Sequence, residues 1–163
     1  MIINNDVLIG LIRKTVDGGL SLRLNVRGFS MAPFIKDRDM VTIKKFGGRA
    51  HIWGTPAVYI HRCGKLVVHR VVGMRGKYYM LKADNSLAPD GYIPQEDLLG
   101  RVVRIERGNV DVSFCLGSSR FPLAIMSRFN VLPRMLRLYR LLRSAAWKYK
   151  RRISLVSIKY YTT

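Results

Sequence analysis

The feature that most constrains the fold of this chain is a succession of short segments in which apolar and polar residues alternate. Alternation with a period of two is typical of strands with one buried face. Turns of hairpin length that contain glycine separate several of these segments, so neighbouring strands are expected to pair antiparallel. The expected strands are residues 21–26, 39–46, 57–61, 65–73, 77–82, 98–106 and 110–114.

These segments predict a mostly β domain, either an antiparallel sheet folded over on itself or a partly open barrel. A short helix is expected before them at residues 5–16, where Asn5 or Asp6 supplies an N-cap and apolar residues recur on one side. We therefore divide the 163 residues into an N-terminal helix (1–19), a β module (20–115) and a C-terminal tail (116–163).

The tail carries an unusual share of the positive charge. The chain has a formal net charge of +19, and eleven Lys and Arg but no carboxylate follow Asp111. Such an imbalance favours an anionic partner. Residues 131–150 predict an amphipathic helix, for which three interpretations stay open. The helix packs on the module, or it lies on an anionic membrane surface. Nucleic-acid binding is the least favoured, because no recognition motif accompanies the charge.

Other features of the sequence bear on location and cofactors. We find neither a secretory signal pattern nor an uncharged stretch long enough to span a bilayer. The expected location is therefore the cytoplasm, with peripheral association with the membrane through the tail. Cys63 and Cys115 lack the spacing of metal ligands, so neither a metal nor another cofactor is expected.

Ser30, in the string "RGFSMAPF", is the first candidate for chemistry. Serine and proline are common in turns, and a turn is the simpler interpretation. A serine nucleophile would need a neighbouring base. Of the three histidines, His51 and His61 stand in unpatterned surroundings, whereas His69 lies inside the expected strand "KLVVHRVVG". A histidine on an apolar strand face is often structural, so its position alone does not identify a base.

Asp84 and Asn85 directly follow the expected strand at 77–82. Such residues after a strand commonly form a turn. An aspartate in this place could instead accept a hydrogen bond from His69 and fix its tautomer, which would complete a Ser-His-Asp triad.

Together these segments resemble the catalytic boxes of the type I signal peptidase and LexA-like serine peptidase family. The nucleophile box Gly-x-Ser-Met-x-Pro matches residues 28–33, and a Lys-Arg-Val or His-Arg-Val box matches residues 69–71. A Lys-Gly-Asp-Asn box resembles residues 82–85, and the resemblance covers about residues 21–106. It implies the family's folded-over β fold and a histidine as the base. The implied catalytic residues are Ser30 (nucleophile), His69 (general base) and Asp84 (orienting carboxylate), with Gly28, Met31 and Pro33 near the substrate and the oxyanion.

The resemblance implies a serine endopeptidase that cleaves a peptide or leader segment of a protein substrate through an acyl-enzyme. Three positions depart from the family pattern: Arg38 and Ala83 replace glycines, and Gly28 replaces a serine found in many members. These departures keep an alternative open. In it the peptidase fold is catalytically degenerate and serves as a membrane-associated or nucleic-acid-binding accessory protein.

Overall fold

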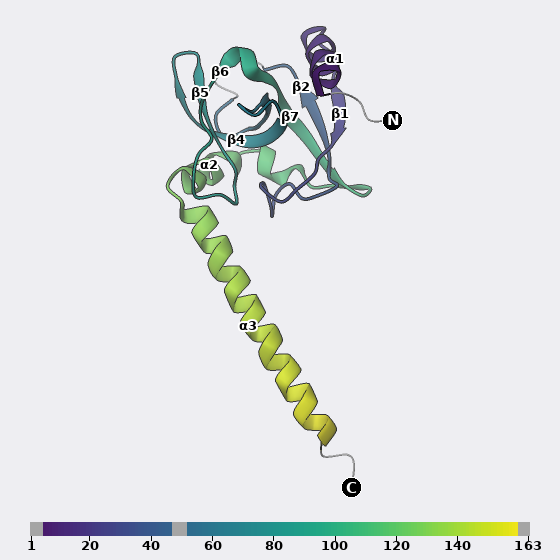
Figure 1. Cartoon of the computed structure of the whole chain (residues 1–163), viewed down its shortest axis with the longest axis vertical. Helices are drawn as coiled ribbons and strands as arrows, with labels where there is room; N and C mark the ends of the chain where they lie inside the picture. Colours follow the sequence, from purple (N-terminus) through teal and green to yellow (C-terminus); the bar gives the residue numbers. More distant parts are fainter. Residues whose placement is uncertain (1–4, 47–51, 160–163) are drawn as a thin grey trace.

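The computed structural model describes residues 5–46 and 52–159, which form a folded-over β module with one long helix projecting from it (Figure 1). Three α-helices, two short 3-10 helices and eight strands occur in this part of the chain. In chain order they are α1 (Asn5–Asp17), β1 (Leu22–Asn25), β2 (Met40–Lys44), β3 (Pro56–Ile60), β4 (Leu66–Arg75), β5 (Tyr78–Lys82), β6 (Gly91–Pro94), η2 (Gln95–Asp97), β7 (Leu98–Arg107), β8 (Val110–Asp111), η3 (Ser113–Leu116), α2 (Arg120–Arg128) and α3 (Val131–Lys159).

The strands form a single antiparallel sheet in the order β1-β2-β7-β3-β4-β5-β6, with β8 paired to β7. The pairings β2–β7, β3–β7 and β4–β5 each contain a shift of register. Bulges of this kind bend strands and increase their twist, which allows a sheet to fold over on itself. The mostly β fold expected from the alternating segments is therefore confirmed.

The folded-over sheet encloses two apolar clusters. The first lies under α1, which inserts Ile12 and Val16 against β2 and β7, and it includes Met31 and Ile35 from the turn after β1. The second lies mainly among strands β3 to β6, and its largest members are the buried Tyr59 and Tyr79. The segment around Ser30 is thus anchored by apolar side chains on its C-terminal side, although Ser30 itself is exposed.

Helix α2 packs directly on the β module. The ammonium group of the buried Lys82, on β5, donates to the carbonyl of Ser127 and to the side chain of Asn130. Arg128 donates to the carbonyl of Val72 on β4. Asn130 has a positive φ of 62° and separates α2 from α3. These contacts attach the α2–α3 junction to the sheet.

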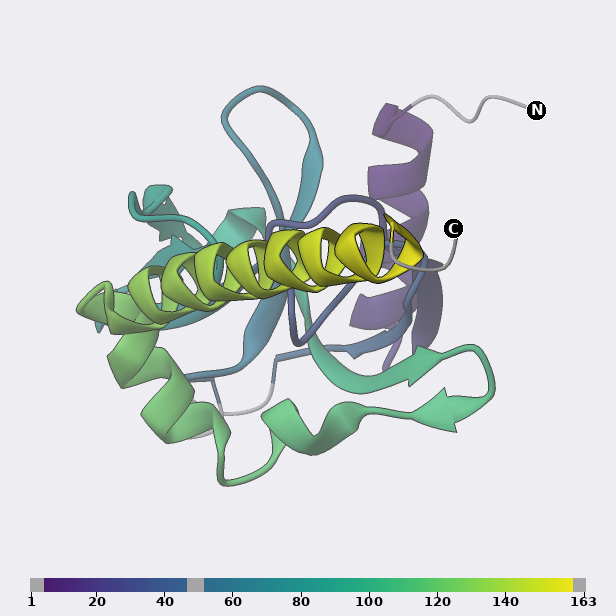
Figure 2. The ribbon, with the colours of Figure 1, turned by 90° about the horizontal axis from the view of Figure 1, so that it is seen from below.

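Helix α3 leaves the module at this junction and runs beneath it, toward the side that carries α1 (Figure 2). It starts where the sequence predicted but continues to Lys159, beyond the expected end near residue 150. Its length does not make it a membrane span, since arginines interrupt it throughout and no described helix is apolar enough to cross a bilayer.

Three elements differ from the expectation. The sequence analysis missed β6, whose terminal residues Gly91 and Pro94 are both rare inside strands. It also missed α2. The strand expected at 110–114 ends at Asp111, because the carboxylate of Asp111 accepts the N–H of Ser113 and a 3-10 turn follows.

Candidate active site

Ser30 begins a tight turn that follows β1. The chain enters this turn through Gly28, whose φ of 99° is a conformation that glycine adopts without a steric penalty. The N–H of Gly28 donates to the carboxylate of Asp37 at 2.8 Å. Beyond Ser30, the carbonyl of Met31 accepts the N–H groups of Phe34 and Ile35. The turn therefore holds the Ser30 hydroxyl at the surface while the next side chain, Met31, is buried in the core.

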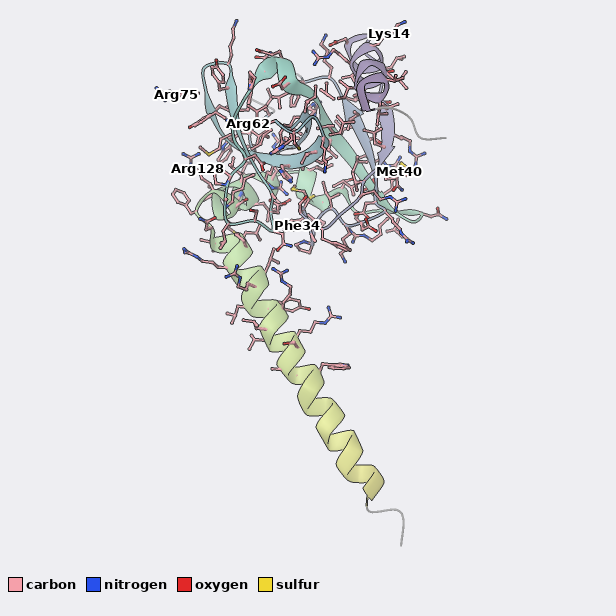
Figure 3. The ribbon with its side chains drawn as sticks, in the orientation of Figure 1. Lys14, Phe34, Met40, Arg62, Arg75 and Arg128 are labelled. Carbon is pink, nitrogen blue, oxygen red and sulfur yellow. The ribbon has the colours of Figure 1, made fainter. Side chains whose placement is uncertain are left out.

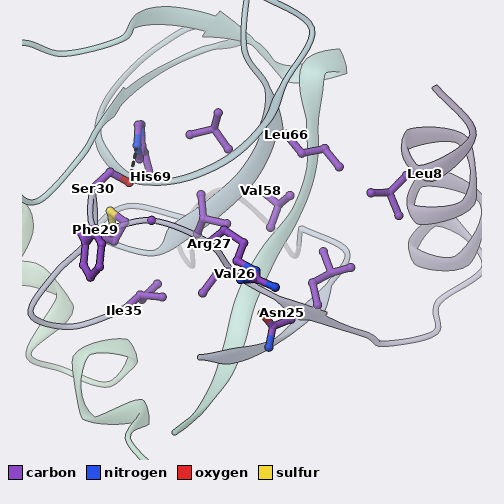
Figure 4. A pocket seen from close by; sticks show the side chains of 15 residues that line it. Leu8, Asn25, Val26, Arg27, Phe29, Ser30, Ile35, Val58, Leu66 and His69 are labelled. Atoms are coloured by element: carbon purple, nitrogen blue, oxygen red, sulfur yellow. Dashed lines mark hydrogen bonds between the residues drawn. The ribbon is translucent and has the colours of Figure 1, made fainter. Parts of the chain in front are cut away.

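His69 lies on β4 and meets this turn. Its Nε2 is 3.1 Å from the Ser30 Oγ, although the two residues are 39 positions apart in the sequence (Figure 4). The histidine side chain is 10% exposed, so it is largely shielded from water while the serine stays accessible. The structure thus brings together the two residues that the sequence proposed as nucleophile and base.

The carboxylate at the other ring nitrogen belongs to Asp90, which the sequence analysis missed. The Asp90 Oδ2 lies 2.6 Å from the His69 Nδ1. A carboxylate there accepts the Nδ1–H and leaves Nε2 free to accept the Ser30 hydroxyl proton. Asp90 reaches this place because its own N–H donates to the Leu81 carbonyl, which folds the loop after β5 back to the start of β6.

Asp84, which the sequence proposed for this position, has a different partner. Both of its carboxylate oxygens accept from the guanidinium of Arg70, at 2.8 and 2.7 Å, and neither side chain is exposed. Arg70 also donates to the carbonyl of Gly54. Because His69 and Arg70 are adjacent on a strand, their side chains point to opposite faces. The expected contact between Asp84 and His69 is therefore wrong, and Asp84 ties β4 to the loop after β5.

Tyr59 on β3 also adjoins His69. Its hydroxyl lies 3.4 Å from the His69 Nδ1. Burial, together with the nearby Asp90 carboxylate, raises the pKa of the Tyr59 phenol, which therefore stays protonated. Tyr59 lies in the expected strand at residues 57–61, and nothing in the local sequence indicates that it lies next to the site.

Asn85 holds the backbone on both sides of the Ser30 α-carbon. Its N–H donates to the carbonyl of Ser30 at 2.9 Å, and its side-chain amide donates to the carbonyl of Phe29 at 3.3 Å. In a trans peptide the N–H points away from the carbonyl. Fixing the Phe29 carbonyl therefore also fixes the direction of the Ser30 N–H, which has no acceptor among the hydrogen bonds described. The Asn85 side-chain oxygen in turn accepts from Arg140 of α3, at 2.9 Å.

Ser30 and His69 lie at one end of a cleft of about 560 Å³ (Figure 4). One wall is β1 and the segment that leads to Ser30, and the other is the first half of β4, residues 66–69. The lining is mainly apolar, with Val58 of β3 in the middle of the cleft and Leu8 of α1 at the end away from Ser30 (Figure 4). Gly28 and Met31 line this cleft as well, whereas Pro33 does not belong to its lining and is exposed.

The two glycine replacements have different structural consequences. Arg38 has a φ of 68°, a left-handed conformation in which a non-glycine side chain is strained. Its N–H still donates to the carbonyl of Val26, so the turn closes despite the replacement. Ala83 is buried and is absent from the residues with positive φ, so no glycine is needed there.

Among the side chains that the structure describes, those of residues 7–46 and 52–147, no three His, Cys, Asp or Glu side chains gather closely enough to hold a metal ion. His61 contacts Cys63 on the exposed β3–β4 turn, and His51 lies outside the described residues. Lys82, the lysine of the third motif, donates to Ser127 and Asn130 at the α2–α3 junction.

The folded-over antiparallel sheet is consistent with the fold of LexA-like and signal-peptidase-like proteins. In agreement, a family model described as Peptidase S24-like matches residues 8–103. The match covers more than half of the chain, and the chain belongs to this family. A search of the curated proteins gives no match. The resemblance seen in the sequence is thereby confirmed, and the family assignment supports a peptidase-like fold.

Proposed function

We propose that the chain is a serine endopeptidase in which Ser30 is the nucleophile, His69 the general base and Asp90 the carboxylate that orients the base. The observation that carries this proposal is the continuous hydrogen-bonded series from the Ser30 Oγ through both ring nitrogens of His69 to Asp90. A serine needs such a base to become a nucleophile, and the base needs a third group to fix its tautomer.

In the proposed mechanism the Ser30 Oγ attacks the carbonyl carbon of the scissile peptide bond while the His69 Nε2 accepts the hydroxyl proton. The Ser30 N–H, oriented through Asn85, donates to the developing oxyanion. His69 then gives its proton to the leaving amine as the C–N bond breaks, which leaves an acyl ester on Ser30. Water, deprotonated by the same nitrogen, hydrolyses the ester. Asp90 stabilises the imidazolium in both steps.

The cleft favours an extended peptide as the substrate. Residues 66–69 of β4 pair with β3 on one side, whereas the pairing of β4 with β5 begins only at Arg70. Residues 22–25 of β1 pair with β2, and no strand is described on the opposite edge. Two unpaired backbone edges therefore face the cleft, and a peptide strand placed between them would find main-chain partners. The apolar lining favours apolar side chains next to the scissile bond.

A peptide-library digestion tests this proposal. The purified chain is incubated with a mixture of peptides, and new termini are identified by mass spectrometry. We expect cleavage that shares a preference for apolar residues and that disappears in Ser30→Ala. Ser86→Ala is the matched control, because within the described part of the chain the Ser86 hydroxyl bonds to the backbone of Ala88 and to no residue of the site. Equal peptide patterns for the wild type and Ser30→Ala would support the alternative in which the peptidase fold has lost catalysis. The family also has non-catalytic members.

A further inference from the structure

Among residues 131–147, whose side chains the structure describes, α3 is buried only near its beginning, and Arg140 adds a hydrogen bond to Asn85 of the module. Leu132 and Pro133 are buried and Leu136 is half-buried, whereas every residue from 137 to 147 is exposed. The first interpretation of the tail, a helix packed along the module, therefore does not describe α3. The exposed part includes an apolar set that we call the α3 stripe, made of Met135, Leu138, Tyr139 and Leu142.

Two members of the α3 stripe, Leu138 and Leu142, face away from the module. Arg140 marks the side of the helix that faces the module, since its guanidinium bonds to Asn85. At about 100° per residue, Leu138 and Leu142 lie nearly opposite Arg140 on the helix. Their side chains are 57% and 62% exposed. No described element of this chain covers the stripe.

The charges around the stripe indicate what covers it. Arg134 and Arg143 flank the α3 stripe on its two sides, and Arg137 and Arg140 lie on the face behind it. A second copy would bring an equally basic helix without carboxylates against it, which like charges oppose. A nucleic acid would satisfy the arginines but leave the stripe in water. The interface of an anionic lipid layer accommodates both the stripe and the arginines, because acyl chains cover the stripe while headgroups neutralise the flanking arginines.

We propose that α3 lies in the interface of an anionic membrane with its stripe toward the acyl chains, and that it holds the β module on the lipid surface. The Arg140–Asn85 bond links the module-facing side of the helix to the backbone of Ser30. The side of the module that carries Phe34, four residues after Ser30, is also the side from which α3 projects (Figure 3). Ser30 then lies on the module-facing side of α3, separated from the lipid surface by the helix and by the Arg140–Asn85 contact. If the proposed peptidase function holds, its substrates are peptide segments lying on or emerging from that surface.

Co-sedimentation with vesicles tests the proposal without any need for an active serine. The full chain is mixed with vesicles of phosphatidylcholine alone or with an equal part of phosphatidylglycerol. We expect the wild type to sediment much more with the anionic vesicles than with phosphatidylcholine alone. Raising the salt to about 1 M, where the Debye length falls to about 3 Å, should weaken but not abolish this binding, because the buried stripe does not depend on charge.

The variant Leu138→Ser with Leu142→Ser isolates the stripe. We expect its partitioning to anionic vesicles to fall by on the order of a hundredfold, since two leucine side chains lose their burial. The control, Leu20→Ser with Val110→Ser, removes two equally exposed apolar side chains from the module and should bind like the wild type. Unchanged binding of the stripe variant overturns the proposal. So does a wild type that ignores anionic vesicles, including one that instead dimerises or binds duplex nucleic acid. Either failure leaves the peptide-library result unaffected.

Discussion

Asp84 and Asp90 lie in the same loop after β5, yet their partners differ, and this difference is open to test at the scale of single residues. We expect Asp90→Asn to slow acylation of Ser30 by about 10²–10⁴, because His69 loses the group that fixes its tautomer. Its unfolding free energy should fall less than that of Asp84→Asn, because Asp90 keeps 15% of its side chain exposed whereas Asp84 is fully buried against a charged guanidinium. Both quantities are measurable by labelling with a fluorophosphonate and by urea unfolding.

Asp84→Asn is the matched comparison. It leaves the buried guanidinium of Arg70 without its charge partner, and breaking a buried pair in this way costs about 3–5 kcal/mol. We therefore expect a marked loss of unfolding free energy, with acylation lost only to the extent that the fold is lost. Normal acylation in Asp90→Asn, together with a folded but unreactive Asp84→Asn, would restore the assignment first made from the sequence.

Asn85 offers a second prediction at this scale. Asn85→Ala removes the side-chain bonds to Phe29 and Arg140 but keeps the backbone bond to Ser30. If the side chain fixes the direction of the Ser30 N–H, acylation should slow by about tenfold while the unfolding free energy falls by only about 1 kcal/mol. Ser86→Ala in the same loop should leave the acylation rate unchanged. Equal rates for the two variants would remove Asn85 from the account.

Sequence reasoning reached Ser30 and His69 because each stands in a recognisable motif with a local setting, a turn and a strand. Asp90 has no such motif. It reaches His69 because the loop after β5 folds back to β6, and β6 was not predicted because it begins with Gly91 and ends with Pro94. A motif gives the positions of residues in the sequence but not their tertiary contacts. Which of Asp84 and Asp90 contacts His69 depends on the folded structure, in which the buried Arg70 pairs with Asp84.

At the scale of elements, the attachment of α2 to the sheet depends on Lys82. Burial lowers the pKa of Lys82, and Arg134 lowers it further, against the opposing effect of Asp84. Between the lowered value and the ordinary value near 10.4, the unfolded chain holds a proton that the folded chain has released. Unfolding then takes up a proton, so raising the pH through this window favours the folded state.

We therefore expect the unfolding free energy of the wild type to rise relative to that of Lys82→Met between pH 7 and about pH 10. Urea unfolding at several pH values measures this difference. Lys77→Met, at an exposed lysine on the neighbouring turn, should keep the wild-type pH dependence. A difference between the wild type and Lys82→Met that stays flat or falls with pH would contradict a lowered pKa of Lys82 in the folded chain.

Element prediction succeeded where the burial pattern is periodic. The alternating segments became β1 to β5 and β7, and the apolar repeat at 131–150 became part of α3. It failed for α2, a nine-residue helix with Pro122 in its first turn, whose position depends on contacts with β4 and Lys82 rather than on a strong pattern of its own. Tertiary contacts of this kind leave little local signal.

At the scale of the whole molecule, the contacts of α2 indicate where the stable unit ends. A chain that stops after Leu136 loses the exposed residues 137–147, with the Arg140 bond, and the segment after them, so its unfolding free energy should stay within about 1 kcal/mol of the full chain. A chain that stops after Leu116 also loses the buried Ala124 and Leu132, and we expect a fall of at least about 2 kcal/mol. Thermal unfolding compares the three lengths. Equal stability of the shortest chain would show that the β module needs no α2.

The central claim is that Ser30 is a nucleophile activated by His69. The most direct measurement is intact-protein mass spectrometry after reaction with a fluorophosphonate, followed by location of the adduct on the peptide that contains Ser30. The account predicts one adduct on the wild type at Ser30, none on Ser30→Ala, and a rate lowered by at least about 10²-fold in His69→Ala. A folded wild type that takes up no adduct, or a His69→Ala variant that reacts as fast as the wild type, would contradict it.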